Sequence, residues 1–317
     1  MGGGRFVAVV VGALILLVLA LAPAVLSPFL VQFLINLFML ATLAESWNII
    51  GGFTGYASFG NVAFFGVGAY ATAVLLTVAA WPFALALPAG GLLALAFAAL
   101  VGMPILRLKG HYFGIATLGV AETTREIVYN LTVTGGGTGL TMPIVKSPLP
   151  FFYLMLGILA AATAVNGWLS ASRFGYGLAA IRENEDAAAA MGIDTARYKT
   201  IAFAMSGGFA GLAGGVFAYW ITFIDPDAVF RVLTTIQMII MAVFGGMGTV
   251  VGPLLGALVL TSVSEILSTQ LVSLAELFNG LIVVLVVLFM PKGLAEVIRT
   301  RQFSLRHFVR NLREYRI

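Results

Sequence analysis

The sequence predicts an all-α polytopic membrane protein, because it is strongly apolar, its apolar residues form runs of membrane-spanning length, and its basic residues lie between alternate runs. Of its 317 residues 61% are hydrophobic and 9% are charged, with a mean hydropathy of +1.05. Soluble domains carry about 25% charged residues. A soluble fold of this length does not bury so much apolar surface, so the bilayer is the expected solvent.

Ten apolar runs follow one another along the chain, and each predicts a helix because backbone polar groups cannot remain unpaired in hydrocarbon. They occupy residues 6–26, 28–50, 56–80, 82–106, 111–131, 150–170, 200–222, 233–246, 250–268 and 274–290. The length of the first run favours a retained helix over a cleaved signal peptide. The fifth run carries charges and the eighth is short, so both are candidates for tilted or re-entrant segments. We expect about 8–10 transmembrane helices with glycine-rich broken or re-entrant segments.

The distribution of Lys and Arg predicts an orientation, because these residues favour the cytoplasmic ends of spans. With the N-terminus placed inside, all of the 17 basic residues except Arg125, Lys146 and Arg231 lie on the cytoplasmic side. The sequence thus predicts cytoplasmic N- and C-termini and a multi-pass protein of the bacterial inner (cytoplasmic) membrane. This topology also accounts for the net charge of +4, so no nucleic-acid partner is expected.

Two parts of the chain differ in character: a transmembrane domain, residues 1–294, and a basic amphipathic C-terminal tail, residues 295–317. In the tail, apolar residues from Leu305 onward recur at helical spacing, while Arg306, Arg310 and Arg313 occupy another face. Such a helix suits the headgroup region of a membrane. Contact with another protein fits the same pattern.

The longest polar loop, residues 173–199, is predicted to be cytoplasmic. Its segment 178–191 is rich in helix-forming residues and ends at Gly192, a residue suited to a left-handed turn. Asp194 is placed to cap the helix that follows. From composition alone the loop is either a solvated connection or a short rigid helix to which another protein can bind.

Small and polar residues lie at membrane depth in two segments of the chain. The members singled out are Gly51, Gly52, Gly55, Ser58 and Asn61 in the first segment, and Gly245, Gly246, Gly248 and Thr249 in the second. Interrupted helices in both halves of a transporter often mark the substrate path, because unwound backbone exposes polar groups. Close packing through small residues explains the pattern without any cargo, and we favour it for Gly66 and Gly68.

Enzyme chemistry finds no support in the sequence. Cysteine is absent and the two histidines, His111 and His307, are far apart, so no catalytic residue, metal site or cofactor is predicted. Glu45 is the deepest ionisable residue, and we expect it to snorkel to the interface or to pair with a partner subunit. Glu265 lies near an outer end and suggests no special role. No chain of ionisable residues crosses the membrane, which argues against a proton-coupled carrier and less strongly against a sodium-coupled one.

The cytoplasmic loop carries a motif that resembles a known docking loop. Asp186-Ala187-Ala188 followed by Gly192 is similar to the Glu-Ala-Ala-x-x-x-Gly loop through which permeases of ABC importers engage their ATPases, although Asp replaces Glu and the terminal Leu-Pro is missing. Longer blocks resemble the LivM-type permease of branched-chain amino acid ABC importers and keep that family's order. They lie at residues 107–119, 134–139, 172–185, 190–194 and 244–249, within a resemblance that runs from about residue 44 to residue 293.

The resemblance implies an ATP-driven importer that brings branched-chain or related amino acids into the cytoplasm. This chain would be its transmembrane permease subunit, partnered by a homologous LivH-type permease, two cytoplasmic ATPase subunits and a periplasmic solute-binding protein within a lipid bilayer. A partner would bind ATP, since the chain has no Gly-x-x-x-x-Gly-Lys-Ser/Thr sequence. The implied ATPase-coupling residues are Arg182, Glu183, Glu185, Asp186, Ala187, Ala188 and Gly192. The alternative function is a self-sufficient secondary transporter of a small solute.

Overall fold

The computed structural model describes residues 3–270, and nine of the ten apolar runs lie within this part of the chain. Each of the nine contains a helix. The bounds are α1 Gly3–Leu21, α2 Pro28–Thr54, α3 Asn61–Thr77, α4 Phe83–Ile105, α5 His111–Asn130, α6 Leu149–Ala171, α9 Thr195–Ile221, α11 Val232–Gly245 and α12 Gly252–Gln270. The tenth run and the predicted amphipathic tail lie outside the described residues.

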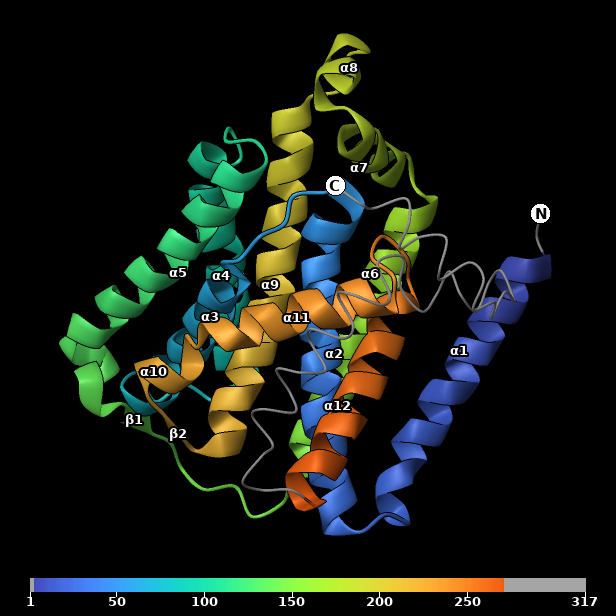
Figure 1. Ribbon diagram of the computed structural model, residues 1–317. Coiled ribbons are helices and arrows are strands. Elements are labelled where there is room, and N and C mark those ends of the chain that lie inside the picture. The colour runs from blue at the N-terminus through green and yellow to red at the C-terminus, as the bar shows by residue number, and fades with distance from the viewer. Residues whose placement is uncertain (1–2, 271–317) are drawn as a thin grey trace.

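The polar connections hold the remaining elements. These are α7 Arg173–Glu183, α8 Glu185–Ala190, α10 Pro226–Val229, the short 3₁₀ turns η1 Ala22–Ala24, η2 Thr132–Thr134 and η3 Gly136–Thr138, and the strands β1 Leu140–Thr141 and β2 Phe223–Ile224. The two strands pair antiparallel, with Leu140 opposite Ile224. Figure 1 shows α8 at one end of the molecule and α10 with the strands toward the other, with α9 running between them.

Length and composition allow five segments of the described chain to cross a membrane: α2, α4, α6, α9 and residues Pro226–Gly245, which join α10 to α11. Shorter apolar helices are present at Val10–Ala24, Asn61–Thr77 and Gly252–Leu267. The all-α polytopic fold predicted from the sequence is therefore confirmed. Helix α5 is not among these five segments, because it carries the charged residues Glu122, Arg125 and Glu126. Its sequence had already suggested that it is not an ordinary span.

Helix α2 forms the centre of the core. Every residue from 41 to 54 is buried, as expected for a helix that is apolar on all sides and enclosed by others. It packs against α6, α9, α11 and α12, and α11 crosses it (Figure 1). Small residues allow close approach elsewhere: a Cβ on Gly68 would clash with the backbone of Gly211, and one on Gly66 with the ring of Phe230. Packing through small residues is thus confirmed for Gly66 and Gly68.

The predicted loop helix is divided in two. The sequence indicated one helix over residues 178–191, but the chain turns at Asn184, whose φ is −161°. The Asn184 side chain accepts a hydrogen bond from the Ala187 amide, so it caps a new helix, α8, after ending α7. Asn is a strong N-cap residue, but flanking helix formers hid this signal in the sequence.

Candidate functional site

The end of α8 is fixed by a left-handed turn at Gly192, as the sequence predicted. Gly192 has φ +87°, and its amide donates to the Ala189 carbonyl while the Ile193 amide donates to that of Ala188. This pair of bonds is a Schellman motif. Asp194 then accepts a hydrogen bond from the Arg197 amide at 3.1 Å and caps α9. The loop therefore passes from α8 into a membrane helix with no flexible segment between them.

Most of the predicted coupling residues are exposed at this end of the molecule. Arg182, Glu183, Asp186, Ala187 and Gly192 face outward, while Ala188 is buried. The Asp186 carboxylate lies 2.7 Å from the Lys109 ammonium, and this hydrogen bond raises the pKa of Lys109 above its ordinary value. Both side chains are largely exposed, so this ion pair stabilises the fold little. The outer face of α8 is available to a partner.

Glu185 differs from its neighbours because it reaches into a buried polar cluster. The Lys199 ammonium, only 3% exposed, donates to the Glu185 carboxylate at 2.6 Å. It also donates to the Tyr56 hydroxyl at 2.9 Å and to the Leu106 carbonyl at 2.7 Å. Since an ammonium has three donors, Lys199 is fully satisfied. The Tyr56 hydroxyl in turn donates to the second oxygen of Glu185.

Hydrogen bonding in this cluster holds Glu185 in its charged form. Burial alone raises the pKa of Glu185, but the hydrogen bonds from Lys199 and Tyr56 outweigh it and leave the pKa below its ordinary value of 4.5. Burial and the adjacent Glu185 carboxylate raise the pKa of the Tyr56 hydroxyl, so that tyrosine stays neutral. We call Tyr56, Glu185 and Lys199 the buried triad. It ties α8 to α9 and to the loop between α2 and α3.

Arg182 makes a second connection, to both glycine-rich segments. Its guanidinium donates to the Gly52 carbonyl at 3.0 Å. A Cβ on Gly248 would lie 2.6 Å from that guanidinium, and one on Gly55 would lie 2.9 Å from the Arg182 Cγ. Both glycines also have φ near +75°, which side-chain-bearing residues adopt poorly. Only glycine therefore fits where Arg182 crosses the two segments.

Asn48 joins the two glycine-rich segments directly. Its side-chain oxygen accepts a hydrogen bond from the Gly248 amide at 2.7 Å, and its side-chain nitrogen donates to the Thr249 carbonyl at 2.9 Å. That nitrogen also donates to the Asn166 side chain on α6 at 3.0 Å. Thr249 accepts from the Gly252 amide and so caps α12. Segments about 200 residues apart thus meet Arg182 at one place, which we call the coupling junction.

Other predicted path residues lie in closed packing. Ser58 and Asn61 are fully buried, and Asn61 donates to the Ser206 hydroxyl on α9 at 2.8 Å. A Cβ on Gly51 would clash with the ring of Trp47 on the same helix. In the second segment, Gly245 and Gly246 approach the backbone of Gly252 closely. These residues form no open route in this conformation.

The expectation that Glu45 snorkels to the interface is wrong. Glu45 is fully buried, nine residues before the end of α2, or about 13 Å along the helix axis. Within the described part of the chain, neither carboxylate oxygen has a hydrogen-bond partner. The sequence showed a charge near a helix end, but α2 extends to Thr54 and carries Glu45 into the interior.

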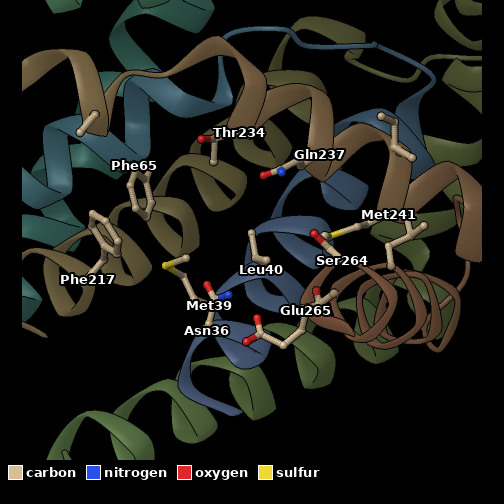
Figure 2. Close-up of a pocket in the computed structure, with 14 residues that line it drawn as sticks. Asn36, Met39, Leu40, Phe65, Phe217, Thr234, Gln237, Met241, Ser264 and Glu265 are labelled. Atoms are coloured by element: carbon tan, nitrogen blue, oxygen red, sulfur yellow. The ribbon is translucent and has the colours of Figure 1, made fainter. Parts of the chain in front are cut away.

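Two cavities are lined partly by residues of α2. An open one of about 710 Å³ lies beside the coupling junction, lined in part by Tyr56, Lys109, Arg182 and Glu185. A smaller one of about 270 Å³ lies among α2, α11 and α12, and Figure 2 shows its lining. The second cavity and the buried roles of Tyr56 and Lys199 were not predicted from the sequence. One signal was available for the cavity, since Thr261, Ser264 and Glu265 repeat at helical spacing on α12.

The fold defines a multi-pass helical membrane protein whose loop helix α7 is tied to the transmembrane core through Arg182. A family model described as the permease component of branched-chain amino acid transport systems matches residues 29–290. The chain belongs to this family.

Individual relatives agree with the family match. The high-affinity branched-chain amino acid transport system permease protein LivM of Escherichia coli (strain K12) is 30% identical over 80% of this chain and 66% of its own length. LivM of Salmonella typhimurium (strain LT2) is 29% identical with the same coverage. The autoinducer 2 import system permease protein LsrC of Yersinia pestis (strain Pestoides F) is 33% identical over 61% of this chain and 58% of its own length. This chain thus spans slightly less than two thirds of either LivM protein. No solved structure matches it.

Proposed function

We propose that this chain is the transmembrane permease subunit of an ATP-binding-cassette importer of the bacterial inner membrane, and that it passes branched-chain or related amino acids into the cytoplasm. The observation that carries the proposal is the coupling junction, where Arg182 contacts both glycine-rich segments from α7, the loop helix that leads directly into the exposed helix α8. A self-sufficient secondary transporter has no need of such an exposed helix. The names of the LivM relatives support the substrate class, while that of LsrC shows that related permeases serve other cargo.

The subunit works with several partners in this proposal. Two cytoplasmic ATPases bind and hydrolyse ATP, a homologous LivH-type permease completes the path, and a periplasmic solute-binding protein delivers the cargo. One ATPase contacts Asp186 and Ala187 on α8, together with the neighbouring exposed coupling residues Arg182, Glu183 and Gly192. The open cavity beside Tyr56 and Arg182 makes this docking surface concave.

Movement of α8 reaches the membrane core by two rigid routes. Glu185 carries it through Lys199 into α9 and through Tyr56 into the loop that begins α3. Arg182 lies on α7, which directly precedes α8, and transmits the movement to Gly52 on α2 and to the Gly245–Thr249 turn that ends α11. The route through Glu185 and Lys199 is buried, and such contacts transmit displacement well because protein interiors are close-packed and compress little. ATP-driven motion at α8 therefore separates the two glycine-rich segments, which line the route only in the open state.

The turn at Gly192 provides the test of ATPase coupling. Gly192→Val is expected to lower ATP-dependent leucine uptake at least 10-fold in vesicles containing all subunits, because φ +87° is strongly disfavoured for a β-branched residue. Gly192→Asn is the matched control, since Asn tolerates the left-handed region, and it should keep most of the uptake. Uptake without ATP or the ATPases would instead support the secondary transporter, and normal uptake by Gly192→Val would remove α8 from the coupling route.

Thiol labelling tests the opening of the glycine-rich segments. The chain has no native cysteine, so Ser58→Cys introduces a single reactive group. Since Ser58 is fully buried here, we expect at least 10-fold slower labelling by a charged thiol reagent in the resting complex than during ATP turnover. Cysteine at Ile144, which is 83% exposed in the polar loop between β1 and α6, controls for reagent access and should label at similar rates in both states. If Ser58→Cys is equally protected from the reagent in both states, the glycine-rich segments serve packing only and do not line the route.

A further inference from the structure

The cavity among α2, α11 and α12 has two chemically different walls. Figure 2 shows the rings of Phe65 and Phe217 on one side and the side chains of Ser264 and Glu265 on the other. Leu40 points into the space between them. Among the lining residues that belong to the described part of the chain, Glu265 is the only one with an ionisable side chain. An occupant would therefore meet an apolar surface at one end and a carboxylate with polar neighbours at the other.

One buried lining residue points to an occupant. Thr261 is 4% exposed, and its hydroxyl has no hydrogen-bond partner within the described part of the chain. A buried hydroxyl without a partner costs about 1–3 kcal/mol, so such groups are usually satisfied by water or ligand. The volume of about 270 Å³ lies just below the usual range for small-molecule sites, so only a small solute fits. The cavity thus has room for a small amphipathic solute, and the Thr261 hydroxyl is available to form a hydrogen bond with it.

The cavity is also connected to the coupling junction. Along α2, Leu40 in the cavity and Gly52 in the junction are twelve residues apart, or about 18 Å. Helix α11 borders both, since Gln237 and Met241 line the cavity and the helix ends in the turn that contacts Arg182. A displacement of that turn therefore shifts one wall of the cavity.

We propose that this cavity is a transient binding site for the transported solute, an amino acid with a short aliphatic side chain. The proposal rests on the importer function proposed above and adds a place for the cargo within this chain. Glu265 attracts the ammonium group of the solute, Thr261 and Gln237 donate to its carboxylate, and the Phe65 and Phe217 rings cover its aliphatic side chain. Binding is weak because the solute must leave again, and α11 closes or opens the site as the junction moves.

Protection from thiol labelling tests this site separately from transport. In the complete detergent-solubilised complex carrying Ser264→Cys as the only cysteine of this chain, L-leucine at tens of millimolar should slow labelling at least 3-fold, and equimolar sucrose should not. Adding Glu265→Gln should remove most of that protection. Leucine should give Leu258→Cys no protection, since that residue lies on α12 outside the cavity. Leu40→Cys serves as a second reporter if Ser264→Cys fails to assemble.

The outcomes separate this site from the importer function. A complex that takes up leucine, yet shows no leucine protection at either cysteine, would overturn the cavity site and leave the importer function intact. Protection that survives Glu265→Gln would overturn recognition of the ammonium group. A wild-type complex that takes up no amino acid at all would remove the importer function, and the cavity site with it.

Discussion

Replacing Lys199 with Met is expected to destabilise the protein by about 3 kcal/mol and to uncouple ATP hydrolysis from uptake. The substitution keeps the length of the side chain but removes the charge that satisfies Glu185, which is only 16% exposed. Removing one partner of a buried ion pair leaves the other charge uncompensated and costs about 3–5 kcal/mol. The lower value applies because Tyr56 still donates to Glu185. Thermal unfolding in detergent and the ratio of leucine taken up to ATP hydrolysed would measure the two effects.

Lys109→Met is the matched control for this prediction. Lys109 also binds an acidic residue of α8, at 2.7 Å, but the two side chains are 58% and 85% exposed. Exposed pairs are screened by solvent, so this variant should unfold close to the wild-type temperature. If the Lys109 and Lys199 variants lose stability equally, burial of the triad does not explain the loss of stability. A Lys199→Met complex with normal coupling would show that motion does not pass through Glu185.

The buried triad also predicts a pH dependence. The pKa of Glu185 is lower in the folded protein than its ordinary value of 4.5, so its contribution to stability is fully present above that value. The contribution is lost as the pH falls through the lower, folded-state pKa. Across the neutral range, therefore, titration of Glu185 should leave the unfolding temperature unchanged.

Replacing Gly52 with Ala is expected to destabilise the protein by about 2 kcal/mol and to reduce ATP-coupled uptake. The added Cβ would lie 2.5 Å from the Gly248 amide nitrogen and would also clash with the Asn48 side-chain oxygen. Overpacking of this kind costs about 1–3 kcal/mol. It also breaks the hydrogen bond between Gly248 and Asn48, which contributes about 1 kcal/mol. The same unfolding and uptake measurements apply.

Gly119→Ala provides the control, because it makes the same chemical change in the middle of α5 where a Cβ meets nothing within 4 Å. Removing a helix glycine there should stabilise the protein by roughly 0.5–1 kcal/mol. Equal unfolding temperatures for the Gly52 and Gly119 variants would mean that the two glycine-rich segments do not depend on close contact.

Much of the candidate site could be predicted because it lies in local sequence patterns. Gly192 and Asp194 act through bonds to residues within a few positions, and such turns and caps depend on short-range stereochemistry. The glycines of the two segments were also recognisable as unusual. Their contact with Arg182 was not, because nothing in a linear sequence shows which segments will be neighbours after folding.

The sequence by itself determined the membrane-helical class, the order of the apolar helices and the family resemblance, since hydrophobicity and spacing are properties of the chain alone. The tertiary structure alone decided which polar residues meet. Lys199 looked like one more basic residue of a cytoplasmic loop, and Glu45 like a charge near an interface. Packing buried both, giving Lys199 three acceptors and Glu45 none within the described residues. The physical reason is that the environment of a buried polar group is set by side chains from distant helices, whose arrangement is fixed by the packing of the whole core.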